Sequence, residues 1–161
     1  MKKLAVLLAA ALFCQASIAD VIEGRVVAVA DGDTITVIDD GRKPHRIRLV
    51  GIDSPEKKQA FGQRSKQSLS DMVYGKQVSV IFDKRDRYGR ILGKVVTPAG
   101  DVNLAQIHAG MAWHYKHYAK DQPASERVAY AKAEEHARLT GKGLWADSDP
   151  TPPWDWRRTT R

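Results

Sequence analysis

The sequence has very little cysteine and no long hydrophobic run. Its only cysteine, Cys14, lies near the N-terminus of a chain of 161 residues. A single thiol excludes an internal disulfide framework and a zinc site built from several cysteines. The apolar stretch from Leu4 to Cys14 is shorter than the roughly 20 residues that a helix needs to cross a bilayer. The sequence therefore excludes a disulfide scaffold and argues against a retained membrane anchor in this segment, which stays the alternative interpretation.

The N-terminus instead has the pattern of an export signal. Met1-Lys2-Lys3 supply positive charge, an apolar stretch follows, and Ser17-Ile18-Ala19 has the small-x-small form of a cleavage site. We expect cleavage after Ala19, so that residues 1–19 are a signal peptide and Cys14 is removed. Phe13 is bulky where bacterial lipoproteins keep a small residue, so we do not expect lipidation. The predicted location is periplasmic or secreted, with no stable membrane anchor after cleavage.

The chain has more basic than acidic residues. It contains 26 Lys and Arg against 19 Asp and Glu, a formal charge of +7, and loss of Lys2 and Lys3 with the leader lowers this by two. A basic surface favours phosphate polymers, although it also suits anionic membranes or no specific partner. Charge alone therefore supports nucleic-acid binding only weakly.

Periodic apolar residues predict a single α+β domain. Alternation predicts strands at 21–30, 34–38, 45–52, 77–83 and 90–96, and helical spacing predicts helices at 61–73, 103–110 and 123–141. The last helix is expected to place Ala124, Val128, Ala131 and Leu139 on its buried face. Five short strands with a helix after the third and two helices after the fifth indicate a small barrel flanked by about three helices.

Carboxylates and arginines stand at the ends of these strands. Asp33 lies in Asp31-Gly32-Asp33-Thr34, whereas Asp53 and Glu56 lie in Asp53-Ser54-Pro55-Glu56. Arg48 precedes Asp53 by five residues, and Arg90 begins the fifth strand. Each position alone is also compatible with a turn or a solvated surface. Together, three carboxylates and two guanidiniums are what a metal-assisted phosphodiesterase needs, because they can hold a hard cation, activate water and bind phosphate.

In this order, the five charged positions resemble the staphylococcal nuclease-like (thermonuclease) family. The resemblance runs from about Val26 to Trp145. It implies a five-stranded OB-fold-like barrel, with a nuclease domain over residues 20–146. The tail at 147–161, rich in Pro, Trp and Arg, is expected to lie on the domain surface or to be loose.

The resemblance also implies a role for each site residue. Asp33, Asp53 and the backbone carbonyl of Ser54 match the calcium ligands of the family. Glu56 matches the carboxylate that orients or deprotonates the attacking water. Arg48 and Arg90 match the pair that binds the scissile phosphate. Calcium is a hard ion suited to carboxylate, carbonyl and water oxygens, and magnesium or manganese remains a possible substitute.

Further residues are expected to contact substrate. Tyr88 matches a family substrate contact, Tyr115 or Tyr118 matches a second, and Arg87 stands beside Tyr88. Aromatic faces stack on any base, although the segment 113–118 also fits simple alternation of core and surface residues. The expected substrates are DNA and RNA, cut to leave 3′-phosphate ends, and the expected state is a monomer.

Three alternatives stay open at the level of sequence. His114-x-Lys116-x4-Asp121 fits the motif of the phospholipase D family, but the Gly-Ser expected after it is absent. His114 and His117 form a possible zinc pair without a third ligand. A barrel that binds nucleic acid without cutting it is the third alternative, and retention of all five charged positions argues against it.

Overall fold

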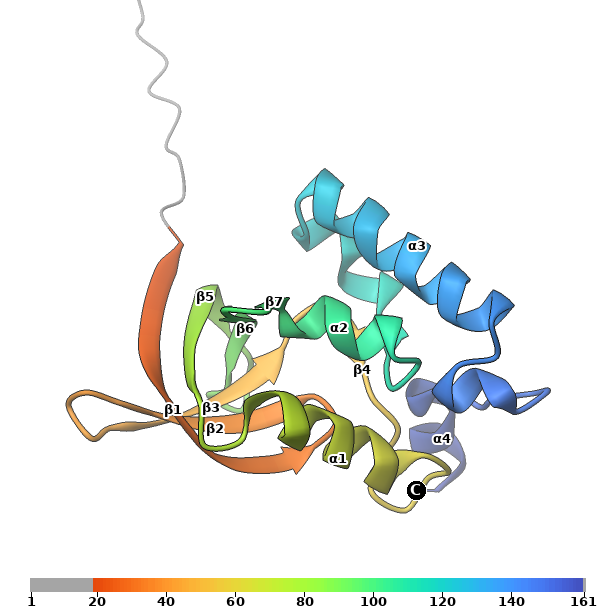
Figure 1. Ribbon diagram of the computed structural model, residues 1–161, viewed down its shortest axis with the longest axis horizontal. Helices are drawn as coiled ribbons and strands as arrows, with labels where there is room; N and C mark the ends of the chain where they lie inside the picture. The colour runs from red at the N-terminus through yellow and green to blue at the C-terminus, as the bar shows by residue number, and fades with distance from the viewer. Residues whose placement is uncertain (1–18, 161) are drawn as a thin grey trace, which may run out of the picture.

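The computed structural model describes residues 19–160, which form a closed barrel with helices packed on one side (Figure 1). The predicted cleavage site therefore lies at the edge of the described residues, and the rest of the leader lies outside them. The main sheet has the strand order β3-β2-β1-β5-β6-β7. Its strands are β1 (Asp20–Asp31), β2 (Thr34–Asp39), β3 (Pro44–Leu49), β5 (Gln77–Arg85), β6 (Ile91–Thr97) and β7 (Gly100–Asp101).

A parallel pairing between β3 and β6 closes the barrel. Ile47 lies opposite Ile91, and Arg48 lies opposite Leu92. All other pairings among these strands are antiparallel. Closure turns the alternate apolar side chains inward, and the fully buried set includes Val26, Ile35, Val37, Ile47, Val80, Ile91 and Val95. Burial of each such side chain contributes about 1.5–3 kcal/mol, and the predicted five-stranded α+β barrel is confirmed.

The third predicted strand is interrupted, which the sequence analysis missed. After β3 the chain turns at Gly51, whose φ of 74° is a conformation that favours glycine. It then forms β4 (Ile52–Asp53), which pairs with β8 (Trp113–His114) in a separate two-stranded sheet. This turn directs Asp53 away from the barrel wall and toward the β1–β2 turn.

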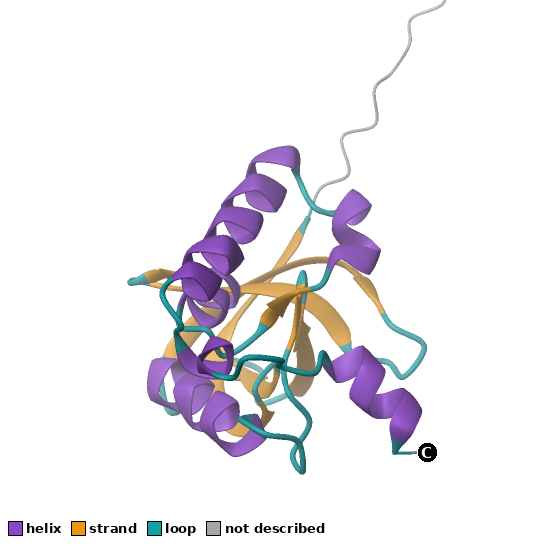
Figure 2. Ribbon diagram, turned by 90° about the vertical axis from the view of Figure 1, so that its right-hand side faces the viewer, coloured by secondary structure: helices purple, strands orange, loops and turns teal. Residues whose placement is uncertain are grey.

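Three helices cover one side of the barrel (Figure 2). They are α1 (Gly62–Val73), α2 (Val102–His108) and α3 (Ala124–Leu139). Asn103 of α2 is fully buried and fastens the helix to the barrel: it accepts from the Val95 N–H and donates to the carbonyls of Val50 and Gly93. No helix within residues 19–160 is long and apolar enough to cross a membrane.

The predicted buried face of α3 was wrong. Ala124, Val128, Ala131 and Leu139 are exposed, and the buried residues are Tyr130, Ala133, Glu134 and Ala137. The buried face includes two polar groups that have partners. Tyr130 donates its hydroxyl hydrogen to Asp101, and Glu134 accepts from the backbone N–H of His114 and from Lys116. Apolar periodicity therefore indicated the wrong side, because hydrogen bonds allow polar residues to be buried.

The tail forms a short helix that packs on the domain. After the 3₁₀ turns η1 (Lys116–Asp121) and η2 (Gly143–Ala146), the chain ends in α4 (Pro153–Thr159). Figure 1 shows α4 beside the segment that joins β4 to α1. The Gln59 side chain of that segment donates to the carbonyl of Thr151 at 2.6 Å, which fixes the start of α4.

Candidate active site

Asp33 sits in the tight β1–β2 turn and points into the protein. Its side chain is almost fully buried and accepts from both the backbone N–H and the hydroxyl of Ser54, each at 2.7 Å. The turn packs closely on α1, since a Cβ on Gly32 would clash with the Ser65 hydroxyl. The β1–β2 turn and the segment after β4 are thereby held against each other.

Arg48 joins Asp33 to Asp53. One of its terminal nitrogens lies 2.9 Å from Asp33 Oδ2, and the other lies 2.8 Å from Asp53 Oδ1. The first nitrogen also donates to the carbonyl of Ile52 at 3.1 Å. The guanidinium is mostly buried, and two carboxylates on different elements are brought together by one cation. Such a bidentate fork is specific to arginine.

Arg157 enters the same site from α4. Its two terminal nitrogens lie 2.7 Å from Asp53 Oδ2 and 2.7 Å from Glu56 Oε1. Asp53 is therefore held between two guanidiniums: Arg48 donates to Oδ1 at 2.8 Å, and Arg157 donates to Oδ2 at 2.7 Å and to Oδ1 at 3.3 Å. Glu56 is about half exposed and is connected to Asp53 through Arg157. The structure thus brings together Asp33, Asp53, Ser54, Glu56 and Arg48, as the sequence predicted, and adds Arg157.

Burial and neighbouring charges act in opposite directions on these groups. Burial raises the pKa of Asp53, although hydrogen bonds from Arg157 and the charge of Arg48 oppose the rise. Burial alone would lower the pKa of Arg157, but its hydrogen bonds to Asp53 and Glu56 outweigh burial and raise it. Burial, together with the charge of Asp33, raises the pKa of Asp31 to about 6. The acidic groups of the site lie close together, and their ionisation is favoured by the nearby guanidiniums.

Arg90 lies in the β5–β6 turn, directly before the strand that pairs with the strand of Arg48, and is outside this cluster. It directly precedes Ile91, which pairs with Ile47 across the barrel closure. Its Nε donates to Asp86 at 2.7 Å within the β5–β6 turn. The structure thus sets Arg48 on β3 and Arg90 directly before the neighbouring strand β6, with Arg90 bound to its own turn.

The predicted substrate residues form two groups. Tyr88 is 69 % exposed at the tip of the β5–β6 turn, with Arg87 and Arg90 over its ring at 4.9 and 5.7 Å. The second group is Tyr115 and Tyr118, whose ring centroids are 5.6 Å apart. Lys84 of β5 and Asp121 of η1 form an ion pair at 2.8 Å, which ties the segments carrying the two groups together.

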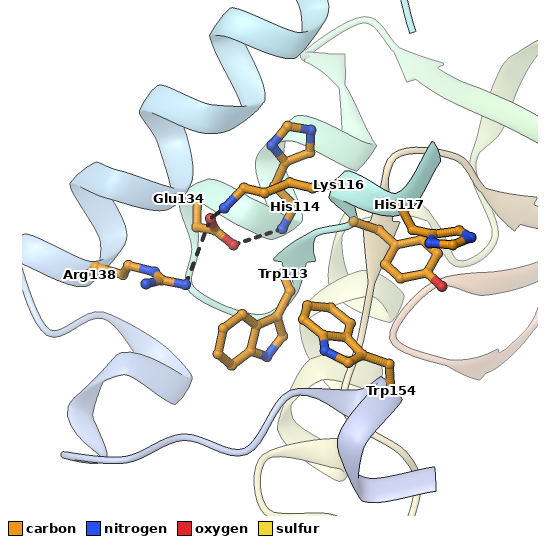
Figure 3. A pocket seen from close by; sticks show the side chains of 8 residues that line it. Trp113, His114, Lys116, His117, Glu134, Arg138 and Trp154 are labelled. Atoms are coloured by element: carbon orange, nitrogen blue, oxygen red, sulfur yellow. Dashed lines mark hydrogen bonds and ion pairs between the residues drawn. The ribbon is translucent and has the colours of Figure 1, made fainter. Parts of the chain in front are cut away.

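Tyr115 lies between the carboxylate cluster and a cavity. The Tyr115 ring lies 5.5 Å from the ring of Trp154, which is on the same helix as Arg157. Burial raises the pKa of Tyr115, and the charge of Asp53 raises it further. The cavity has a volume of about 380 Å³ (Figure 3). Its walls are aromatic on one side and charged on the other: Trp113, His114, Tyr115, Lys116, His117, Glu134, Arg138 and Trp154.

The oxygen donors of the cluster suit a hard cation. Residues 19–160 contain no group of three or more His, Cys, Asp or Glu side chains placed to hold a metal ion. Asp33 and Asp53 nevertheless supply two buried carboxylates, each bound to a different nitrogen of the Arg48 guanidinium. Ser54 directly follows Asp53 and adds a backbone carbonyl oxygen. Carboxylate and carbonyl oxygens completed by water are a set that calcium accepts. The residues present therefore fit the cation that the sequence implied.

The other enzyme motifs do not assemble. His114 is buried with its Nε2 3.1 Å from Gln122, Lys116 pairs with Glu134, and Asp121 pairs with Lys84. Each residue of the phospholipase D-like motif thus has a different partner, so the motif forms no common site. His117 stacks on Tyr115 rather than meeting His114 at a shared centre.

Sequence reasoning missed two residues of the cluster. Asp31 was treated as part of a turn, yet its carboxylate accepts from the Asp33 N–H at 3.1 Å. The Asp-x-Asp spacing was the available signal. Arg157 was treated only as part of a basic tail, and it lies 101 residues from Glu56 in the chain. No local pattern predicts that contact.

Comparison with known proteins gives a consistent family. Residues 46–147 match the family described as "Staphylococcal nuclease homologue". An "Uncharacterized endonuclease" of Escherichia coli is 50% identical over 137 residues, covering 84% of this chain and 85% of that protein. A "Micrococcal nuclease" of Shigella flexneri is 42% identical over 147 residues, covering 86% of this chain and 82% of that protein. Barrel, carboxylate cluster and these similarities agree: the chain belongs to the staphylococcal nuclease family of nucleic-acid-cleaving hydrolases.

Proposed function

We propose that this nuclease is calcium-dependent and hydrolyses phosphodiester bonds within both DNA and RNA, leaving 3′-phosphate ends. The observation that supports the proposal is the pairing of Asp33 and Asp53 through Arg48, with Glu56 beside them. Two carboxylates can hold a cation, a third can take a proton, and guanidiniums can bind phosphate. Relatives named "endonuclease" and "Micrococcal nuclease" support the same reaction class.

Asp33, Asp53 and the carbonyl of Ser54 would hold the calcium ion. When bound, calcium neutralises charge on a phosphate oxygen and lowers the pKa of a nearby water. Asp33 is prepared for this role by Ser54, whose N–H and hydroxyl fix the carboxylate in one orientation. Asp53 is prepared by the short β4 strand, which is paired to β8 and cannot swing freely.

Glu56 would act as the general base. Its carboxylate takes a proton from water as the water oxygen forms a bond to phosphorus and the bond to the 5′ oxygen breaks. The departing 5′ oxygen takes a proton from solvent to become a hydroxyl, and Glu56 then returns its own proton to solvent. Arg48 and Arg90 would bind the non-bridging phosphate oxygens and stabilise the charge that develops on them. Arg48 lies on β3 and Arg90 directly before the neighbouring β6, so they could approach one phosphate from two directions with bidentate hydrogen bonds.

Substrate breadth follows from the residues around the cluster. Tyr88, Tyr115 and Tyr118 offer aromatic faces, and Arg87 adds positive charge. Stacking on aromatic rings contributes about 1–3 kcal/mol per base with little regard to sequence. None of these proposed roles requires a 2′-hydroxyl, which supports action on DNA and RNA alike.

We also propose that the protein is exported and acts as a monomer in the periplasm or outside the cell. The leader at 1–19 supports export, and calcium is plentiful outside the cytosol. N-terminal sequencing of protein recovered from the periplasm should begin at Asp20. Light scattering on the eluting protein should give the mass of one chain.

The central test is cleavage of plasmid DNA, single-stranded DNA and RNA with calcium, with magnesium and with a calcium chelator. The wild type should degrade all three substrates with calcium, and Glu56→Gln should lose about 10²–10⁴-fold in rate while still binding. Glu135→Gln is the matched control, because Glu135 is an exposed acid on α3. Cleavage that survives both the chelator and Glu56→Gln would overturn the proposed mechanism. Binding without any cleavage would instead indicate a nucleic-acid-binding barrel.

A further inference from the structure

The C-terminal segment 151–159, here called the strap, covers the candidate active site with two side chains. Trp154 and Arg157 are three residues apart on α4, so they lie on the same side of the helix. Arg157 contacts the carboxylates, whereas the Trp154 ring lies 5.5 Å from the Tyr115 ring and 5.6 Å from the Trp113 ring. Figure 3 shows the Trp154 and Trp113 rings side by side.

Arg157 binds the acids that the proposed chemistry needs. It donates to both oxygens of Asp53, a proposed calcium ligand, at 2.7 and 3.3 Å, and to one oxygen of Glu56, the proposed base, at 2.7 Å. A guanidinium carries one positive charge and satisfies acceptor oxygens, as a bound cation would. Arg48 already lies on Asp53 Oδ1, and Arg157 adds a second positive charge that a calcium ion would meet at the same carboxylate. Because these positive charges repel one another, the Arg157 guanidinium and a calcium ion compete for Asp53.

Trp154 occupies a surface that the proposed function assigns to a base. Its ring is tilted by 34° to Tyr115, which is close enough to parallel to cover one face of the tyrosine. A nucleobase stacking on that face would have to displace the indole. The strap therefore presents a cation to the acids and an aromatic ring to the stacking residue.

The strap is fastened on both sides of this contact. Gln59 donates to the Thr151 carbonyl at 2.6 Å, and the same side chain accepts from the Glu56 N–H at 3.0 Å. On the other side of α4, Trp156 lines a small cavity together with Pro55 and Phe61. The side chain of Gln59 thus links the position of the strap to the position of the loop that carries Glu56.

We propose that the strap is an autoinhibitory element, which lowers calcium and substrate affinity until both ligands displace Arg157 and Trp154. The inference rests on the proposed calcium-dependent function. If the docked form accounts for about nine molecules in ten, the apparent calcium affinity is reduced about tenfold. The Arg157 side chain is already 40% exposed, so release of the strap exposes mainly Pro153, Trp154 and Trp156.

The test is calorimetric titration of calcium into the purified protein and its variants. Arg157→Ala should bind calcium about tenfold more tightly than the wild type, because the docked competitor is removed. Trp154→Ala should shift the calcium affinity in the same direction, although the contact that it removes is with Tyr115 and not with a carboxylate. Arg158→Ala is the matched control: this side chain is 80% exposed, pairs with Asp155 and carries the same charge. It should stay within about twofold of the wild type, as screening by solvent implies.

Tryptophan emission gives a second readout that does not depend on cleavage. Calcium should change the emission of the wild type saturably as Trp154 leaves Tyr115 and Trp113. In Arg157→Ala much of this change should be present before calcium is added. Circular dichroism melts of each variant verify that the barrel is folded at the titration temperature.

The outcomes separate the two proposals. Unchanged or weaker calcium binding in Arg157→Ala, with calcium-dependent cleavage intact, would overturn the strap as an inhibitor and leave the nuclease mechanism standing. Failure of the wild type and of Arg157→Ala to bind calcium would overturn both proposals together. An equal gain in Arg157→Ala and Arg158→Ala would reduce the effect to net charge and also overturn the strap.

Discussion

The Asp86 carboxylate holds Arg90 twice within one turn, accepting from its backbone N–H at 3.0 Å and from its Nε at 2.7 Å. The same carboxylate accepts from the Tyr88 N–H at 2.9 Å. One acid therefore shapes the β5–β6 turn and orients the guanidinium that the proposed mechanism places on the phosphate. Asp86 is a positioning residue in this view, since it acts on the reaction only through Arg90.

Asp86→Asn should lower kcat about 10- to 100-fold, because a misdirected Arg90 stabilises the transition state less well. Asp83→Asn, an exposed change on the same hairpin, should leave kcat unchanged. Steady-state cleavage of a short fluorescent DNA measures both. Equal activity of the wild type and Asp86→Asn would show that Arg90 needs no such support.

The same pair predicts a dependence of stability on pH. Burial opposes ionisation of Asp86, but the hydrogen bonds from Arg90 and Tyr88 outweigh it and lower the pKa of Asp86. A lowered pKa in the folded state stabilises the fold above the unfolded value of about 4, and this contribution is lost as pH falls through the folded value. Asp86→Asn should thus be less stable than the wild type by about 1 kcal/mol or less at pH 7. The difference should shrink below about pH 4 in urea unfolding, and a constant difference would contradict the linkage.

Asn103 makes a separate prediction about the fold. Asn103→Leu keeps the volume but leaves the Val95 N–H and the Val50 carbonyl without the partner described above, whereas the Gly93 carbonyl still accepts from the Val50 N–H. Each buried polar group left unpaired costs about 1–3 kcal/mol, so we expect a loss of about 2–4 kcal/mol in unfolding free energy. Gln67→Leu, on the exposed face of α1, should change stability by less than about 0.5 kcal/mol. A mild effect of Asn103→Leu would mean that water replaces the amide.

Tyr88 should contribute to binding and not to folding. Tyr88→Ala in a Glu56→Gln background should weaken binding of single-stranded DNA by about 1–3 kcal/mol, the usual value for one stacked base. Fluorescence anisotropy at fixed salt measures the change. Tyr74→Ala removes a similarly exposed tyrosine at the end of α1 and should leave affinity unaltered. Equal losses in both variants would indicate a general surface effect.

Strand and helix positions could be predicted from the sequence because each depends on local periodicity. Ile47 and Leu49 alternate with Arg48, and the structure buries the first two while Arg48 faces the carboxylates. The break at Gly51 escaped notice because apolar Val50 and Ile52 continue the strand pattern on either side. The buried face of α3 was misjudged because Tyr130 and Glu134 are buried through partners on other elements, which no pattern within the helix reveals.

The site residues that lie in short local motifs could be predicted from the sequence. Those that the fold brings in from distant parts of the chain could not. Asp33, Asp53 and Glu56 stand in motifs that can be read along the chain. The Arg157 contact depends on the path of the whole tail, including the η2 turn and the link from Gln59 to Thr151. Composition of the tail suggested only a surface segment, and the structure adds a specific contact with two acids.

The parallel β3–β6 pairing has a consequence for how the protein folds. Segments more than 40 residues apart must meet before Arg48 and Arg90 become neighbours, and such long-range pairing is slow to form. Helices α1 to α3 need only local contacts to begin. In a refolding experiment, the helical signal in far-ultraviolet circular dichroism should therefore recover before nuclease activity. The rate at which cleavage returns would then report the rate at which β3 and β6 pair.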